Sequence, residues 1–203
     1  MKRKRATLAA ALVMAATATA ATAAAQTYEL DPEHTFPSFE ADHMGISVWR
    51  GKFNKTTGTM VLDRAAQTGQ VEAVIDIASV DFGHDKMNEH ALSPDFFNVE
   101  KYPTATYKGT LAAFKDGVPT QVVGELTLHG VTQPLTLDVK LFKCIPHPLY
   151  KRELCGADAY AVFQRDAYGL TAGKYYGFNM DVALRIQMEA LIVEDGGKKK
   201  KKQ

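Results

Sequence analysis

The chain is poor in the residues and motifs that most enzyme classes need. Its 203 residues include two cysteines and one tryptophan, and the cysteines form no C-x-x-C motif, which argues against a thiol oxidoreductase. The sequence contains no G-x-S-x-G nucleophile elbow, no glycine-rich phosphate loop and no H-E-x-x-H zinc motif. Its carboxylates show no spacing that singles out a catalytic pair. A hydrolytic or metal-dependent enzyme is therefore the weaker interpretation.

A long uncharged run occurs only at the amino end. Residues 2–5 are all basic, residues 6–22 carry no charge and are rich in Ala, Leu and Val, and residues 23–25 are three alanines. This order predicts a cleaved secretory signal peptide over residues 1–25, cut before Gln26. A membrane anchor of about 20 residues is the alternative, but the run is mostly Ala and Thr and ends in a good cleavage site. The pattern predicts export from a bacterial cytoplasm.

Positive charge is scarce between the two ends. Four of the 24 basic residues lie at positions 2–5 and five at positions 198–202, which leaves 15 against 23 acidic residues. An acidic body argues against a nucleic-acid partner, because such proteins present a basic face. Residues 194–203 are expected to form a disordered, solvated Lys-rich tail. Transient contact of this tail with an anionic membrane is the alternative.

The two cysteines, Cys144 and Cys155, are close in the sequence of a chain that is expected to be exported. An oxidising compartment then predicts one disulfide between them. Closing a loop of about a dozen residues contributes roughly 3 kcal/mol in the chain-entropy description.

Apolar and polar residues alternate along most of the chain. Residues 71, 73, 75 and 77 are apolar, and residues 135–141 and 182–189 alternate throughout, which predicts antiparallel strands with one face in water. Further strands are expected at residues 35–42, 51–54, 58–62, 104–114, 122–128 and 157–164. Only residues 85–92 have a helical pattern, with Asp85 as the cap. An all-β, closed barrel of about eight strands is predicted, with a two-sheet sandwich as the competing architecture.

Residues 81–103 (DFGHDKMNEHALSPDFFNVEKYP) are the most unusual stretch. Its two histidines, His84 and His90, are six residues apart, whereas neighbours on a helix face are three or four apart. Structural histidines are therefore expected here, with no metal and no cofactor. Aromatic residues recur in this stretch and at strand ends, and a barrel lined by them suits a long apolar ligand.

Several motifs together resemble the YceI-like family. Residues 28–35 (YELDPEHT) resemble its opening Y-x-L-D-x-x-H-[ST], and residues 124–132 (GELTLHGVT) resemble its most specific run, G-x-L-T-[IL]-H-G-V-T. Residues 90–99 with Tyr102-Pro103 resemble the family's H-L…D-F-F…y-P segment, and residues 155–169 resemble C-G-A-D…R-x-x-[FY]-G. The resemblance extends from Tyr28 to about residue 190, so a single domain is expected over residues 26–193.

The resemblance implies an extended lipocalin-like, antiparallel eight-stranded β-barrel with one short helix capping a mouth. It also implies a periplasmic protein, with a polyprenyl phosphate or polyprenyl quinone inside the barrel, no catalytic residues, and a homodimer as a plausible assembly. Two departures from the family pattern are Trp49-Arg50 before Gly51 and Phe36-Pro37. Proline lacks an N–H and belongs at an edge or bulge, so a kinked first strand is expected.

Residues 81–103 are then expected to form a lid, with the aromatic side inward and the charged side in water. Arg165 is expected to satisfy backbone groups rather than grip a head group. The residues predicted to line the barrel and lid are Phe39, Phe53, Val71, Ile75, Ile77, Phe82, Met87, Leu92, Phe96, Phe97, Tyr107, Leu126, Leu128, Phe163, Leu184 and Ile186. Two alternatives are a stress-response interaction module with a filled barrel, and a periplasmic enzyme centred on His84, Asp85 and His90.

Overall fold

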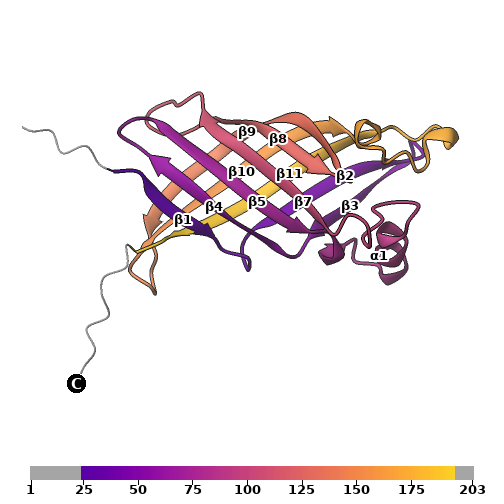
Figure 1. Cartoon of the computed structure of the whole chain (residues 1–203), viewed down its shortest axis with the longest axis horizontal. Coiled ribbons are helices and arrows are strands. Elements are labelled where there is room, and N and C mark those ends of the chain that lie inside the picture. Colours follow the sequence, from indigo (N-terminus) through magenta and orange to yellow (C-terminus); the bar gives the residue numbers. More distant parts are fainter. Residues whose placement is uncertain (1–23, 195–203) are drawn as a thin grey trace, which may run out of the picture.

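The computed structural model describes residues 24–194, in which strands dominate (Figure 1). Most of the predicted signal peptide (1–25) and of the predicted tail (194–203) lies outside this part. The strands are β1 (Gln26–Leu30), β2 (Phe36–His43), β3 (Ser47–Phe53), β4 (Thr56–Asp63), β5 (Thr68–Asp76), β6 (Val80–Asp81), β7 (Thr104–Ala112), β8 (Gln121–Leu128), β9 (Val131–Pro146), β10 (Glu153–Gln164) and β11 (Asp181–Ile192). The helices are α1 (Asp85–Leu92) and the 3₁₀ turns η1 (Ile77–Ser79), η2 (Arg165–Tyr168) and η3 (Lys174–Tyr176).

Eight strands form a closed antiparallel barrel. The order of neighbours is β1-β4-β5-β7-β8-β9-β10-β11, and β1 pairs with β11 to complete the ring. Closure pairs the first strand with the last, Tyr28 opposite Ile192. The predicted eight-stranded barrel is confirmed, and the sandwich is excluded because a closed ring leaves one continuous sheet.

The other three strand segments extend three of the barrel strands. Both β1 and β2 pair with β11, separated by an interruption at residues 31–35. Matching interruptions separate β3 from β4 at residues 54–55, and β5 from β6 at η1. Hydrogen bonds join the β3–β4 interruption to the β5–β6 interruption. The Asn54 N–H donates to the Ser79 carbonyl (3.0 Å), and the Asp76 N–H donates to the Lys55 carbonyl (3.0 Å). The three strands therefore bend together at one level. Pro37, where the sequence predicts a kink, lies within the continuous strand β2 opposite Ile186, and the interruption at residues 31–35 comes before it.

The helix α1 lies at one end of the barrel, together with the β2–β3 turn and the segment 165–180 that links β10 to β11 (Figure 1). Its N-cap is His84, whose Nδ1 accepts a hydrogen bond from the Met87 N–H (3.2 Å). The expected cap, Asp85, is instead the first helical residue, where a carboxylate favours the helix dipole. An imidazole nitrogen satisfies an otherwise unpaired helical N–H, which is the task of a capping side chain.

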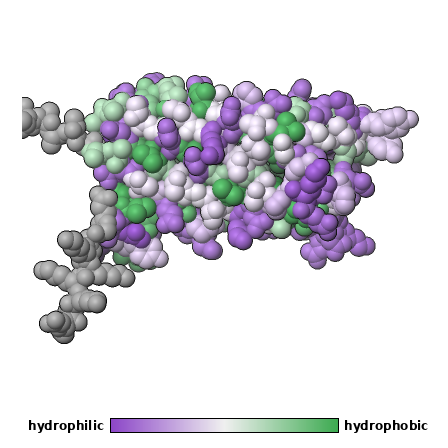
Figure 2. All heavy atoms as spheres, in the orientation of Figure 1, coloured by the Kyte–Doolittle hydropathy of each residue, from purple (hydrophilic) through white to green (hydrophobic). Residues whose placement is uncertain are grey.

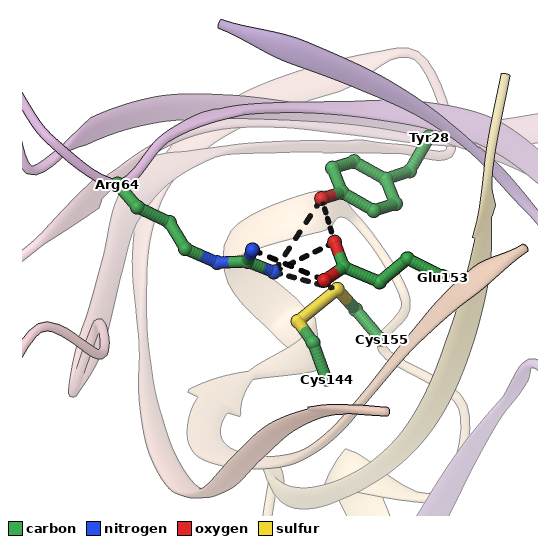
Figure 3. Close-up of a disulfide and its surroundings, with 5 residues drawn as sticks. All are labelled: Tyr28, Arg64, Cys144, Glu153 and Cys155. Atoms are coloured by element: carbon green, nitrogen blue, oxygen red, sulfur yellow. Dashed lines mark hydrogen bonds and ion pairs between the residues drawn. A yellow bond between two sulfur atoms is a disulfide. The ribbon is translucent and has the colours of Figure 1, made fainter. Parts of the chain in front are cut away.

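The opposite end of the barrel is closed by a compact polar cluster around the disulfide (Figure 3). Cys144 and Cys155 face each other on β9 and β10 and are bonded, as predicted. Arg64 reaches Glu153 (2.8 Å), and Glu153 also accepts a hydrogen bond from the Tyr28 hydroxyl. Burial would raise the pKa of Glu153, but the bonds from Arg64 and Tyr28 outweigh burial and lower it. We call these five residues the end plug.

The outer surface mixes hydrophilic and hydrophobic side chains (Figure 2). Within residues 24–194, no helix is both long and apolar enough to cross a membrane. This surface follows from the alternation, since each strand turns one set of side chains inward and the other outward.

Candidate functional site

The barrel encloses an apolar cavity of about 600 Å³. This volume lies in the range of small-molecule pockets, roughly 300–1,000 Å³. Side chains from all eight barrel strands and from the lid line it. The space rules out the filled barrel that the sequence left open as an alternative.

Most of the predicted lining residues lie on the cavity wall. The wall includes Phe39, Phe53, Val71, Ile75, Phe82, Met87, Phe96, Phe97, Tyr107, Leu126, Leu128, Phe163, Leu184 and Ile186. Ile77 and Leu92 differ from the expectation, because they pack into the core without reaching the wall. At Ile77 the extended strand gives way to η1, so the alternation that placed residues 71, 73 and 75 inward no longer applies. Leu92 is the last residue of α1 and packs from the lid against the core.

Sequence analysis missed much of the wall on β9 and β10. Leu135, Leu137 and Val139 face inward, and the alternation of residues 135–141 carries the signal that identifies them. A register shift between Asp158 and Ala159 then reverses the parity. As a result Phe142 faces the cavity and Leu141 is 54% exposed.

Gly124, a glycine of the family motif, leaves space inside the barrel for the side chain of Tyr107. The Tyr107 hydroxyl lies 3.1 Å from the backbone carbonyl of Val122 on β8 and 3.0 Å from that of Leu135 on β9, and these two acceptors share its single hydrogen. A Cβ on Gly124 would lie 2.8 Å from this hydroxyl and 2.3 Å from the Lys108 carbonyl. The glycine of the G-x-L-T run therefore makes room for the tyrosine and for a close approach of β7 and β8. Burial raises the pKa of Tyr107 well above that of a free phenol.

Aromatic rings form a continuous collar around the open end of the cavity. Successive ring centroids lie 5.1–6.0 Å apart, mostly edge to face, an arrangement that adds to the energy of burial. The collar consists of Phe178, His43, Trp49, Phe82, Phe39, Phe53, Phe97, Phe96 and His90. It joins β2 and β3 to the lid and to the segment before β11. The lid is thus placed as predicted, with its aromatic side inward and Asp85, Lys86 and Glu89 exposed.

One buried cation, Arg165, lies at the same end of the cavity. It is 6% exposed, and its guanidinium donates to the carbonyls of Leu170 (2.9 Å) and Ala172 (2.6 Å), as the sequence predicted. The guanidinium also lies 5.8 Å from the centre of the Phe96 ring. Burial lowers the pKa of Arg165, while the charges of Asp166 and Asp42 act in the opposite direction. A guanidinium has five N–H donors, so the group has donors beyond the two that hold these carbonyls.

His90 reaches the cavity wall, as His43 and Asp42 do, but His84 and Asp85 do not. His84 caps α1 and the His90 ring lies tilted against Phe96, so the candidate enzyme centre at His84, Asp85 and His90 does not converge on one point of the cavity. A different group, Asp31, His34 and Glu189, brings potential metal ligands within 4.8 Å of one another. It lies on the outside at the first strand interruption, and His34 Nδ1 already contacts Asp31 (2.8 Å), which raises the pKa of His34.

An antiparallel barrel with a plugged end, an open end and an apolar interior defines a binding barrel of the lipocalin-like kind. Residues 28–190 match the YceI-like domain, and the chain belongs to this family. The family motifs thus map onto structural positions, namely the strand interruption, the lid and the cleared space at Gly124.

Two curated relatives are similar in sequence. Protein YceI of Escherichia coli O6:H1 is 39% identical over 120 residues, or 58% of this chain and 62% of that protein. The aligned region thus spans less than two thirds of that relative. The UPF0312 protein ECA1782 of Pectobacterium atrosepticum is 37% identical over 142 residues, or 70% of this chain and 73% of that protein.

Solved structures share the fold. The Campylobacter jejuni YceI protein has a TM-score of 0.61 at 23% identity and covers 75% of this chain and 90% of its own. A polyisoprenoid binding domain from Saccharophagus degradans has a TM-score of 0.58 at 18% identity, covering 83% of this chain and 99% of its own. At these identities the similarity is one of fold.

Proposed function

We propose that the protein binds a polyisoprenoid lipid, a polyprenyl phosphate or polyprenyl quinone, inside the barrel and carries or stores it in the periplasm without chemical change. The observation that supports this most is the apolar cavity of about 600 Å³ that is plugged at one end and open at the other. Burying each CH₂ group contributes about 0.8 kcal/mol. A prenyl tail therefore needs few polar contacts to bind tightly.

The head group of this ligand lies at the collar end, where the polar groups of the cavity gather. Arg165, His43 and His90 reach the cavity there, and Asp42 adds a carboxylate. Hydrogen-bond donors in an otherwise apolar pocket fix the orientation of a ligand. The tail then extends toward Met60 and Phe142, near the end plug. The fold similarity to a domain described as polyisoprenoid-binding supports this ligand class.

Native mass spectrometry of the protein purified without detergent tests the proposal. We expect a stoichiometric added mass, and extraction should release a lipid whose chain is built of five-carbon units. A bare protein that takes up neither an added polyprenyl quinone nor an added polyprenyl phosphate would contradict the proposal. The same measurement reports whether the protein is the homodimer that the family resemblance implies.

A second experiment tests whether the protein leaves its ligand chemically unchanged. We expect His84→Ala and His90→Ala variants to keep lipid binding, because His84 caps α1 on the surface and His90 contributes one ring edge to the collar. The enzyme alternative would instead be supported if incubation with the parent protein altered the lipid chemically and incubation with these variants did not.

A further inference from the structure

The open end of the barrel carries exposed apolar side chains on two neighbouring loops. The β2–β3 turn presents Met44 and Ile46, the start of β3 presents Val48, and η3 presents Tyr175 and Tyr176. Ile46 is 79% exposed and Tyr175 is 94% exposed. We call these five residues the rim. In Figure 1 the two loops that carry them project at the same end of the barrel.

The two loops are fastened to each other, so the rim is one surface. The Asn179 N–H donates to Asp42 Oδ2 (3.1 Å), and the rings of His43 and Phe178 lie 5.5 Å apart. Tyr176 belongs to both the rim and the cavity wall, although it is 76% exposed. The exposed apolar surface is therefore continuous with the cavity interior.

The β2–β3 turn does not need its apolar residues. Met44 has a φ of 60° and Gly45 a φ of 68°, and the Ile46 N–H bonds to the His43 carbonyl (3.2 Å), as in a β-turn with both central residues at positive φ. Such turns favour Asn or Asp before the Gly, because a residue with a long side chain is disfavoured at positive φ. The backbone of the turn therefore gives no reason for methionine at this position, and the apolar side chain is 56% exposed.

The charges beside the rim are already paired. Lys174 contacts Asp166 (2.6 Å) and Arg50 contacts Glu40 (3.0 Å), while Asp42 accepts backbone N–H groups from Gly45 and Asn179. The exposed lid residues Asp85, Lys86 and Glu89 are of mixed sign. A surface of this kind gains little from attraction to an anionic partner and most from burial of its apolar side chains. Tyrosine favours the membrane–water interface, with its ring in the apolar side and its hydroxyl in water.

We propose that the rim docks on the surface of a lipid bilayer, with Met44, Ile46 and Tyr175 inserted among the lipids, so that the cavity opens directly onto the membrane. This inference rests on the proposed function, since a ligand that resides in a membrane must cross into the cavity without exposing its tail to water. The bilayer needs no net negative charge. The plugged end, where β11 ends, faces away from the membrane.

Trp49, the only tryptophan of the chain, lies in the collar beside the rim and reports docking. The probe is a vesicle of neutral phosphatidylcholine with brominated acyl chains and no prenyl lipid. We expect vesicles to quench Trp49 fluorescence and shift it to the blue, with little change when salt is raised to about 0.5 M. Unquenched Trp49 at saturating vesicle concentration would overturn the proposal.

A matched pair of variants localises the contact. The rim variant Ile46→Ser/Tyr175→Ser is compared with Leu149→Ser/Tyr150→Ser at the β9–β10 turn, where Leu149 is 77% and Tyr150 is 62% exposed. Both variants remove one aliphatic and one tyrosine side chain from the surface, at opposite ends of the barrel. We expect the vesicle affinity of the rim variant to fall at least about tenfold and the control to match the parent protein. Equal losses in both variants would overturn the docking surface.

Ligand uptake separates this inference from the proposed function. The rim variant should take up a polyprenyl quinone from a cyclodextrin complex as the parent protein does, but lose uptake from vesicles. If no form of the protein takes up ligand while the parent protein still docks, the proposed function fails and the docking surface stands. If the rim variant instead keeps full uptake from vesicles, or loses a concentration-dependent dimer, the rim is not a membrane surface.

Discussion

Two tyrosine rings each lie against glycines, because the missing glycine side chain leaves the space that the ring fills. Tyr107 lies against Gly109 and Gly124, and its hydroxyl bridges two backbone carbonyls. A similar exchange occurs at Gly130, where an added Cβ would lie 2.6 Å from the ring of Tyr102. Gly124 and Gly130 of the G-x-L-T run are therefore explained by neighbouring tyrosine rings and backbone.

Gly124→Ala should destabilise the protein. The new Cβ would lie 2.3 Å from the Lys108 carbonyl, which is backbone and cannot move aside. Overpacking of this kind typically costs about 1–3 kcal/mol, measured as the free energy of unfolding in urea. Gly156→Ala is the matched control in a neighbouring region of the sheet, because its Cβ would be no closer than 3.7 Å to any atom. Equal effects of the two substitutions would refute the steric explanation.

Stability should fall with alkaline pH through Tyr28. Burial and the bond to Glu153 raise the pKa of Tyr28 to about 12, from the usual 10.0 of a free tyrosine. Below pH 10 the phenol is neutral in both states, and between about pH 10 and 12 the unfolded chain loses a proton that the folded chain keeps. Deprotonation thus favours unfolding in this window, and thermal melts should show a drop that is smaller in Tyr28→Phe. Tyr160→Phe, on the outer face of β10, is the control and should follow the parent protein.

At the scale of elements, interruptions at one level divide three of the strands into two segments each. The disulfide links the two strands of one hairpin, β9 and β10. The interruptions at residues 31–35, 54–55 and 77–79 allow β1/β2, β3/β4 and β5/β6 to extend past the ring as a longer wall. This wall carries Phe39, Trp49, Phe53 and Phe82 and so supports half of the collar.

Replacing both cysteines, as Cys144→Ala/Cys155→Ala, should lower stability without removing the cavity. The bond closes a hairpin with a sequence separation of 11, and such a closure contributes about 2–3 kcal/mol. The plug lies at the end opposite the collar, so ligand binding at saturation should persist. Chemical denaturation and native mass spectrometry check the two parts of this prediction. Loss of binding in a variant that remains folded would show that the plug shapes the ligand site.

The sequence predicts elements better than it predicts where their alternation fails. Seven of the eight barrel strands, the capping helix and the disulfide follow from period-two patterns, one short amphipathic stretch and two cysteines in a chain that is expected to be exported, whereas β1 (Gln26–Leu30) is not among the expected strands. Ile77 and Leu141 could not be placed this way, because η1 and the β9–β10 register shift depend on pairing partners that are distant in sequence. Arg165 was correctly expected to bind backbone carbonyls. Its place on the cavity wall depends on the course of the whole 165–180 segment.

At the scale of the whole molecule, the same alanine-to-phenylalanine substitution on the inward and on the outward face of the sheet tests whether the ligand binds inside the barrel. Ala159 on β10 lines the cavity, whereas Ala183 on the neighbouring β11 belongs to the outward-facing set. Ala159→Phe should fold and lose most lipid uptake, because the new ring occupies cavity space, and Ala183→Phe should bind as the parent protein does. Native mass spectrometry with added polyprenyl quinone measures both. Unchanged uptake by a folded Ala159→Phe variant would place the ligand outside the barrel.

Closure of the ring by β1 and β11 has a consequence for how the chain could be reconnected. The Val193 N–H bonds to the Thr27 carbonyl (2.8 Å), so the two ends of the described chain leave the barrel side by side. No strand in a closed cycle of antiparallel neighbours is intrinsically the first. A circular permutant that joins these ends and opens the chain at the turn containing Asp116 and Gly117 would keep every strand neighbour. The barrel would then present its cavity unchanged, with its new ends again at the plugged end.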